Sequence, residues 1–243
     1  MQSRIDQYLK INTTDDRGIW IRGTRTLRQV IGVLGMLLPL IILLVSPNCD
    51  SKPLESISHY YYTISGTWFS VILCLVGVFL MVYTKPFWLT TIAAICCFCV
   101  VLFPTSLLGD SCCIVDYPIN PSREIFHYIS AAIFLVILAL LSIFTFPKQD
   151  HEEKEMKMVV SYKWLYVSCG VIMLVAIAII GLYFLADKRN FWNGFVLWYE
   201  NHQMTFWMEV VALECFGLSW LVRGRNTVTQ ATYSTFKSSR VGS

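Results

Sequence analysis

Residues 165–186 read LYVSCGVIMLVAIAIIGLYFLA, a run of 22 residues without Asp, Glu, Lys or Arg. As an α-helix this run would rise about 33 Å, enough to cross a hydrocarbon core of about 30 Å. Five other segments are nearly as apolar, so the sequence predicts six membrane-spanning helices. The predicted spans cover residues 27–45, 64–83, 87–104, 125–146, 165–186 and 205–222.

The composition of the whole chain supports a membrane protein. Of its 243 residues, 56% are hydrophobic and 14% are charged, against roughly 45–50% and about 25% in soluble domains. The predicted fold class is therefore all-α: a polytopic membrane protein built as a six-transmembrane-helix bundle. Residues 1–26 are expected to form a cytoplasmic N-terminal segment, 27–222 the transmembrane domain, and 223–243 a disordered cytoplasmic tail rich in Ser and Thr.

The distribution of Lys and Arg predicts the orientation. If the N-terminus is cytoplasmic, 15 of the 19 Lys and Arg residues lie inside, and only Lys52, Arg123, Lys188 and Arg189 lie outside. Basic residues concentrate in cytoplasmic loops, so we expect both the N-terminal and C-terminal segments inside. The expected location is a plasma membrane, in a bacterium the inner membrane. The net charge of +3 is too small to indicate a nucleic-acid partner.

Three cysteines, Cys49, Cys112 and Cys113, fall in the two predicted outer loops that flank the second and third spans. An oxidising compartment would permit a disulfide from Cys49 to Cys112 or to Cys113. A reduced cluster is the alternative, and a three-cysteine zinc site is less favoured because no regular ligand spacing accompanies these residues.

Ionisable residues inside or beside the spans are few, and burying each of them in lipid costs free energy. Glu209 and Glu214 lie on the last predicted span, about 140° apart around the helix. Glu124 and His127 have the i,i+3 spacing that places them on one helix face. Each such group either caps a helix end, pairs with a neighbour, or belongs to a site.

The site hypothesis places a polar pocket near the outer surface, between the second, fourth and sixth spans. Its candidate ligand-binding residues are His59, Tyr60, Glu124, His127 and Glu209. A small molecule or the headgroup of a membrane lipid would be bound there. No protein partner is indicated by the sequence.

Two other functions use the same residues. A metal-dependent hydrolase acting on lipid would hold zinc with His59, His127 and His202. Glu209 would then be the general base, so that Glu209 and His127 are the catalytic candidates. A proton- or cation-coupled transporter would instead use Glu209 and Glu214 along the last span. Whether the chain is an enzyme is left open by the sequence.

Four motifs occur in order along the spans: SISHYYYT (56–63), LFPT (102–105), HYISAA (127–132) and EVVALECFGLSWLVRG (209–224). Together they resemble those of a family of bacterial six-helix membrane proteins to which no activity is assigned. The resemblance covers the six spans but neither tail, and it implies the fold without a function. Members of that family often carry an acidic residue soon after the Tyr-rich stretch, where this chain has Gly66-Thr67-Trp68.

Overall fold

The computed structural model describes residues 25–46, 52–83, 86–106, 118–149 and 162–241, with side chains up to Arg225. Every regular element among these residues is a helix. The elements are the first helix Arg25–Val45, the 3-10 helix η1 Ile57–Tyr62, α2 Gly66–Val82, α3 Phe87–Leu102, α4 Pro121–Leu140 with the π-helical turn η2 Leu141–Thr145, α6 Lys163–Lys188, α7 Asn193–Asn201 and α8 Met204–Val241. The all-α prediction is confirmed, and each predicted span overlaps one of these helices.

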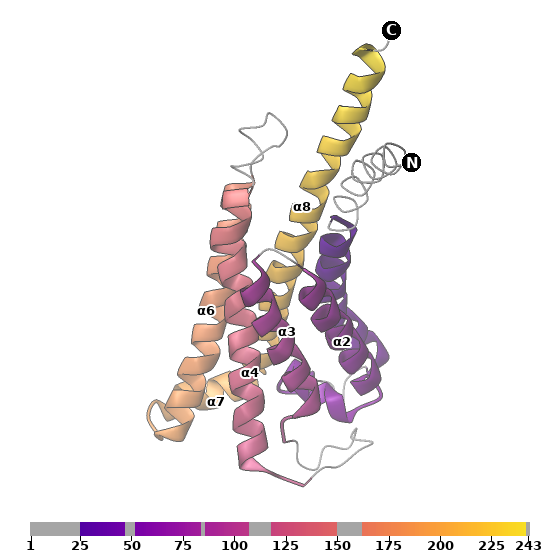
Figure 1. Ribbon diagram of the computed structural model, residues 1–243. Helices are drawn as coiled ribbons and strands as arrows, with labels where there is room; N and C mark the ends of the chain where they lie inside the picture. The colour runs from indigo at the N-terminus through magenta and orange to yellow at the C-terminus, as the bar shows by residue number, and fades with distance from the viewer. Residues whose placement is uncertain (1–24, 47–51, 84–85, 107–117, 150–161, 242–243) are drawn as a thin grey trace.

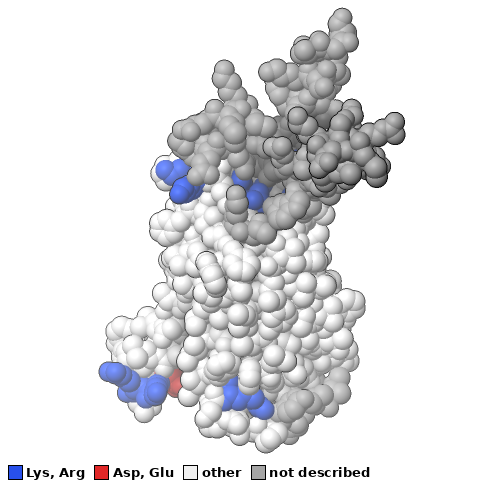
Figure 2. All heavy atoms as spheres, viewed as in Figure 1, with Lys and Arg blue, Asp and Glu red and all other residues white. Residues whose placement is uncertain are grey.

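Four helices among the described residues are long and apolar enough to cross a membrane. They are Arg25–Val45, Pro121–Gln149, Lys163–Lys188 and Met204–Arg225, while α2 and α3 are apolar but shorter. Only 28% of the apolar stretch of α6 is buried inside the protein. Figure 2 shows Lys and Arg side chains gathered at the two ends of the visible face, with a broad uncharged band between them. These features indicate a membrane-embedded protein.

The long helices run side by side along one axis (Figure 1). α6 packs against α8 and α4, and α3 packs between α2 and α4. η1 and α7 lie at one end of this bundle, which we call the η1 end; the first helix begins at the opposite end, where Arg25 lies.

The first helix packs backbone-to-backbone against α8 through glycines. A Cβ on Gly32 would lie 2.7 Å from the carbonyl oxygen of Gly217, and a Cβ on Gly217 would lie 2.6 Å from that of Gly32. Glycine alone permits this approach, which is how small residues bring helices together in membranes. The contact positions the beginning of α8, and so Glu209, relative to the first helix.

Local sequence signals explain where α4 begins. The side chain of Asn120 accepts hydrogen bonds from the N–H groups of Ser122 and Arg123, and Pro121 occupies the first helical position. Both are preferred at helix starts because the first N–H groups have no partner within the helix. The cap places His127 one to two turns inside α4.

η1 and the residues after it are hydrogen-bonded to two neighbouring parts of the bundle, the first helix and the segment after α3. Beyond its end, Thr63 accepts a hydrogen bond from Ser46 at 3.0 Å, and the Ser65 hydroxyl donates to the carbonyl of Ile42 at 3.0 Å. The hydroxyl of Tyr62 donates to the carbonyl of Thr105, beyond α3. The short segment is therefore a fixed part of the bundle.

Two buried arginines lie at the opposite end. Nε of Arg28 donates to the hydroxyl of Tyr83 at 2.8 Å, and Arg28 and Arg223 both donate to the side-chain oxygen of Gln149, at 3.5 and 3.3 Å. Arg223 is fully buried and Arg28 is 7% exposed. These contacts join the first helix, α2, the helical extension of α4 and α8.

Two elements differ from the sequence expectations. The short helix α7 lies between the fifth and sixth predicted spans, where no element is predicted. The backbone of α8 continues as a helix to Val241, where a disordered tail is expected from residue 223. The helix can continue because neither proline nor glycine occurs between Gly224 and Gly242.

Candidate functional site

The carboxylate of Glu209 binds the beginning of η1. It accepts hydrogen bonds from the Ser56 hydroxyl, at 2.9 and 3.0 Å to its two oxygens, and from the Ile57 N–H at 2.6 Å. Its other surroundings are mostly apolar, since Glu209 borders a cavity of about 50 Å³ lined with Ser58 and with apolar residues such as Leu38 and Phe134. A carboxylate there would be costly without partners, and Ser56 and Ile57 provide them.

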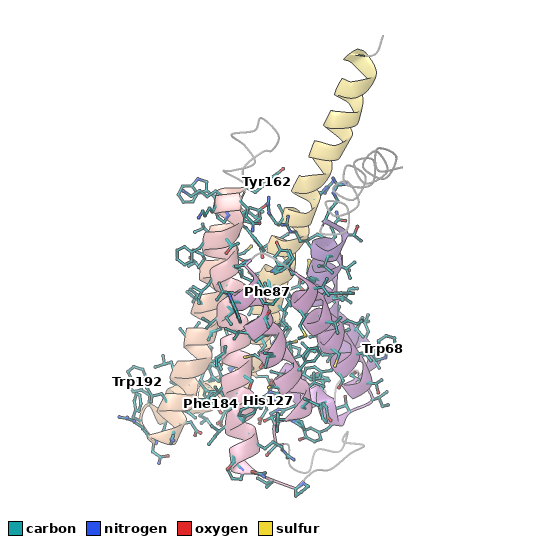
Figure 3. The ribbon with its side chains drawn as sticks, viewed as in Figure 1. Trp68, Phe87, His127, Tyr162, Phe184 and Trp192 are labelled. Atoms are coloured by element: carbon teal, nitrogen blue, oxygen red, sulfur yellow. The ribbon has the colours of Figure 1, made fainter. Side chains whose placement is uncertain are left out.

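His127, which is 1% exposed, binds the same turn from α4 (Figure 3). Nδ1 lies 2.8 Å from the carbonyl oxygen of Phe103, and Nε2 lies 3.0 Å from the hydroxyl oxygen of Ser58. A carbonyl only accepts, so Nδ1 carries a proton and the neutral ring accepts at Nε2 from Ser58. His127 thus joins α3, α4 and η1.

The two residues therefore belong to one polar assembly, but their connection runs through the backbone between them. Glu209 binds Ser56, His127 binds Ser58, and the Ser56 hydroxyl also accepts from the Ser58 N–H at 3.1 Å. Both side chains bind η1, which forms one wall of a cleft. Neither side chain lines that cleft itself.

This cleft has a volume of about 210 Å³ and opens at the η1 end between η1, α4, α6, α7 and the beginning of α8. We call it the outer cleft. Its acidic residues are Glu55, Glu124 and Glu200. Its aromatic residues are Tyr128, Tyr183, Phe184 and Tyr199. Ser56, His59, Gln203, Met204 and Thr205 complete the lining.

The aromatic wall is held in place by ring contacts and by the acids. The rings of Tyr183 and Tyr199 stack with centroids 4.3 Å apart and planes 9° apart, and Phe184 lies 4.9 Å from Tyr128. Tyr128 donates to Glu124 and Tyr183 donates to Glu200, each at 3.0 Å. α4, α6 and α7 therefore meet at this wall (Figure 3 labels Phe184).

His59 lines the cleft and is 7% exposed. Its Nδ1 is buried and has no hydrogen-bond partner among the residues that the structure describes. Burial, with a smaller contribution from His127, lowers the pKa of His59 from 6.5 to about 4. The ring is therefore neutral at pH 7, and a neutral imidazole can accept a hydrogen bond.

The structure distributes the predicted ligand-binding residues among three positions. His59 and Glu124 line the outer cleft, and His127 and Glu209 lie behind it. Tyr60 lies in the core instead: it is 1% exposed, its hydroxyl accepts from the Leu54 N–H, and its ring packs on Phe206. Tyr62 is buried as well and Tyr61 is half-buried, so the run of three tyrosines belongs to the packing of η1.

The metal hypothesis finds no support in the described part of the chain, which contains no group of three or more His, Cys, Asp or Glu side chains able to hold an ion. Both nitrogens of His127 are already hydrogen-bonded. His202 is exposed, with Nδ1 2.7 Å from the carbonyl oxygen of Trp198. The candidate disulfide residues Cys49, Cys112 and Cys113 lie outside the described residues.

Sequence reasoning did not single out Ser56, Ser58, Tyr183, Tyr199 or Glu200 as site residues. The two serines lie in the SISHYYYT motif, and their place beside His59 in that motif could have identified them as site residues. The tyrosines come from the end of α6 and from α7, and only the turn between these helices brings them together.

Comparisons with family models, with curated proteins and with solved structures returned no match to this chain.

Proposed function

We propose that this chain is a six-span plasma-membrane protein, of a bacterial inner membrane, whose outer cleft binds a small ligand or the headgroup of a membrane lipid. Both its N-terminal and C-terminal segments would be cytoplasmic, because 15 of the 19 Lys and Arg residues then lie inside. In this orientation the η1 end faces outward. α2 and α3, with 17 and 16 residues, would complete the six spans.

The family resemblance of the four motifs is part of this proposal. All four motifs supply contacts that hold η1, so they correspond to a structural unit around the cleft. The residues that make these contacts are Ser56, Ser58, Thr105, His127 and Glu209.

The observation that carries the binding function is the outer cleft itself, with its volume of about 210 Å³ and the unpartnered Nδ1 of His59. A buried polar atom without a partner is destabilising, and a bound molecule that contacts it would remove that cost. Convergent polar groups in a concave, partly apolar site are typical of ligand-binding sites.

Native mass spectrometry of protein extracted from its own membrane tests this function. Met204 lines the cleft, so Met204→Trp would fill it, whereas Leu185→Trp adds the same side chain at an exposed position of α6. We expect a bound species in the wild type and in Leu185→Trp that is lost in Met204→Trp. A set of bound species that is the same in all three proteins would contradict the proposal.

A further inference from the structure

Among the described residues, the charged side chains that line the outer cleft are all acidic. Glu55, Glu124 and Glu200 contribute to its lining, and no Lys or Arg of the described residues does. Each of Glu124 and Glu200 accepts one tyrosine hydroxyl through Oε1. Since a carboxylate can accept about four hydrogen bonds, both retain acceptor capacity toward a ligand.

The aromatic wall complements this charge. Tyr128, Tyr183 and Tyr199 surround the acids, with Phe184 between the first two. The faces of aromatic rings carry partial negative charge and attract cations. Carboxylates and ring faces together favour an organic cation, which has both a charge and apolar surface.

A third observation is independent of the acids. His59 is 7% exposed and lines the cleft, and its buried Nδ1 lacks a partner within the described residues. The ring is neutral, so it complements an N–H donor and does not repel a positive charge.

The same residues disfavour a bare metal ion, because no three acidic or histidine side chains of the described chain are close enough to hold one. The volume of about 210 Å³ is several times the roughly 30 Å³ that a water molecule occupies in the liquid. That space suits a headgroup-sized molecule.

We propose that the outer cleft binds a primary organic ammonium ion, with its N–H groups donating to Glu124 and Glu200 and its carbon atoms against Tyr183 and Tyr199. This assignment rests on the proposed function of the cleft as a ligand site. A free amine and the ethanolamine headgroup of a phospholipid share this chemistry.

Thermal unfolding of the full chain in detergent micelles, titrated with small probes, tests the assignment. We expect ethanolamine to raise the unfolding temperature in a saturable manner. Ethylene glycol has the same size without charge, and choline has the charge without N–H donors; each is expected to bind at least tenfold more weakly. Equal binding of either compound would overturn the proposal.

A pair of matched variants locates the effect. Glu200→Gln removes a charge from the cleft and keeps an acceptor for Tyr183, whereas Asp187→Asn removes a charge from an exposed position at the same end, outside the cleft lining. We expect at least tenfold weaker ethanolamine binding for Glu200→Gln and less than a twofold change for Asp187→Asn. Equal effects of the two variants would show that ethanolamine responds to general surface charge, and would overturn the site.

The source of the amine is decided in nanodiscs. Stabilisation by phosphatidylethanolamine relative to phosphatidylglycerol, abolished by Glu200→Gln, assigns the lipid headgroup; stabilisation by added ethanolamine alone assigns a free amine. If ethanolamine has no effect but a species bound to the wild type is lost in Met204→Trp, the ammonium assignment fails and the ligand site stands. If that species is also unaffected by Met204→Trp, the proposed function fails as well.

Discussion

His127 and Glu209 bind the two ends of one three-residue segment. Nε2 of His127 lies 3.0 Å from the Ser58 hydroxyl oxygen, and the oxygens of Glu209 lie 2.9 and 3.0 Å from that of Ser56. α4 and α8 thereby position η1 jointly, and η1 forms one side of the outer cleft.

A double-mutant cycle measures this joint role. His127→Ala and Glu209→Gln should each lower the free energy of unfolding by about 2 kcal/mol, since each removes buried hydrogen bonds. Once either substitution has released η1, the second one removes fewer native contacts. We therefore expect the loss of free energy of unfolding in the double variant to be smaller than the sum of the two single losses by about 0.5 kcal/mol or more. Denaturant unfolding in micelles gives the values.

Glu214→Gln serves as the control for that cycle, because Glu214 is half-buried on the same helix. It should combine additively with His127→Ala. Strict additivity of Glu209→Gln with His127→Ala would mean that the two residues stabilise the bundle independently.

The pH dependence of stability should reflect His59, whose pKa is lowered to about 4 by burial, with a smaller contribution from His127. Above pH 6.5 the ring is neutral in both states. Between pH 6.5 and 4 the unfolded chain binds a proton that the folded chain does not, so stability falls as pH falls, by at most about 1.4 kcal/mol per pH unit from this group.

His59→Gln removes that group and keeps a polar side chain. Unfolding temperatures at pH 7.5 and 5.0 should therefore differ less in His59→Gln than in the wild type. The same decrease in both proteins would assign the pH effect to other residues.

The glycine contact between the first helix and α8 should tolerate no side chain. A Cβ on Gly217 would lie 2.6 Å from the carbonyl oxygen of Gly32 and 2.3 Å from Cγ of Met36, so Gly217→Ala must separate the helices. We expect a loss of about 2 kcal/mol or more. Gly181→Ala is the matched control, because nothing lies within 4 Å of its added Cβ; a similar loss there would contradict the packing explanation.

The proposed topology predicts the side on which each loop lies. Reporter fusions after Lys85 and Lys154 should report the cytoplasm, and fusions after Lys52 and Lys188 the outside, because this arrangement keeps most Lys and Arg inside. An inverted result at any two of these sites would contradict the six-span arrangement.

The helices were predictable because long uncharged runs such as 165–186 have one low-energy solution in an apolar medium. α7 was not, because its sequence NGFVLWYEN mixes polar residues with aromatic residues that are common at membrane interfaces. α7 begins after Trp192, whose φ of 58° is unusual outside glycine and has no sequence signal.

Some ionisable residues at and behind the cleft were predictable, but Glu55, Glu200 and the tyrosines were not. Glu124, His59, His127 and Glu209 were recognised because ionisable groups near a membrane are costly and few. The stacking of Tyr183 on Tyr199 depends on how the chain turns between α6 and α7, and tyrosine is common at membrane interfaces for other reasons.

The most direct test of the ligand site is photocrosslinking in intact membranes. Phe184 lines the outer cleft, and Phe87 lies near the opposite end (Figure 3), so p-azidophenylalanine at either position changes one ring conservatively. After irradiation, mass spectrometry should find a discrete small-molecule or headgroup adduct at position 184 and not at position 87. Adducts that are identical at both positions, or acyl-chain adducts alone at position 184, would contradict a ligand site in the outer cleft.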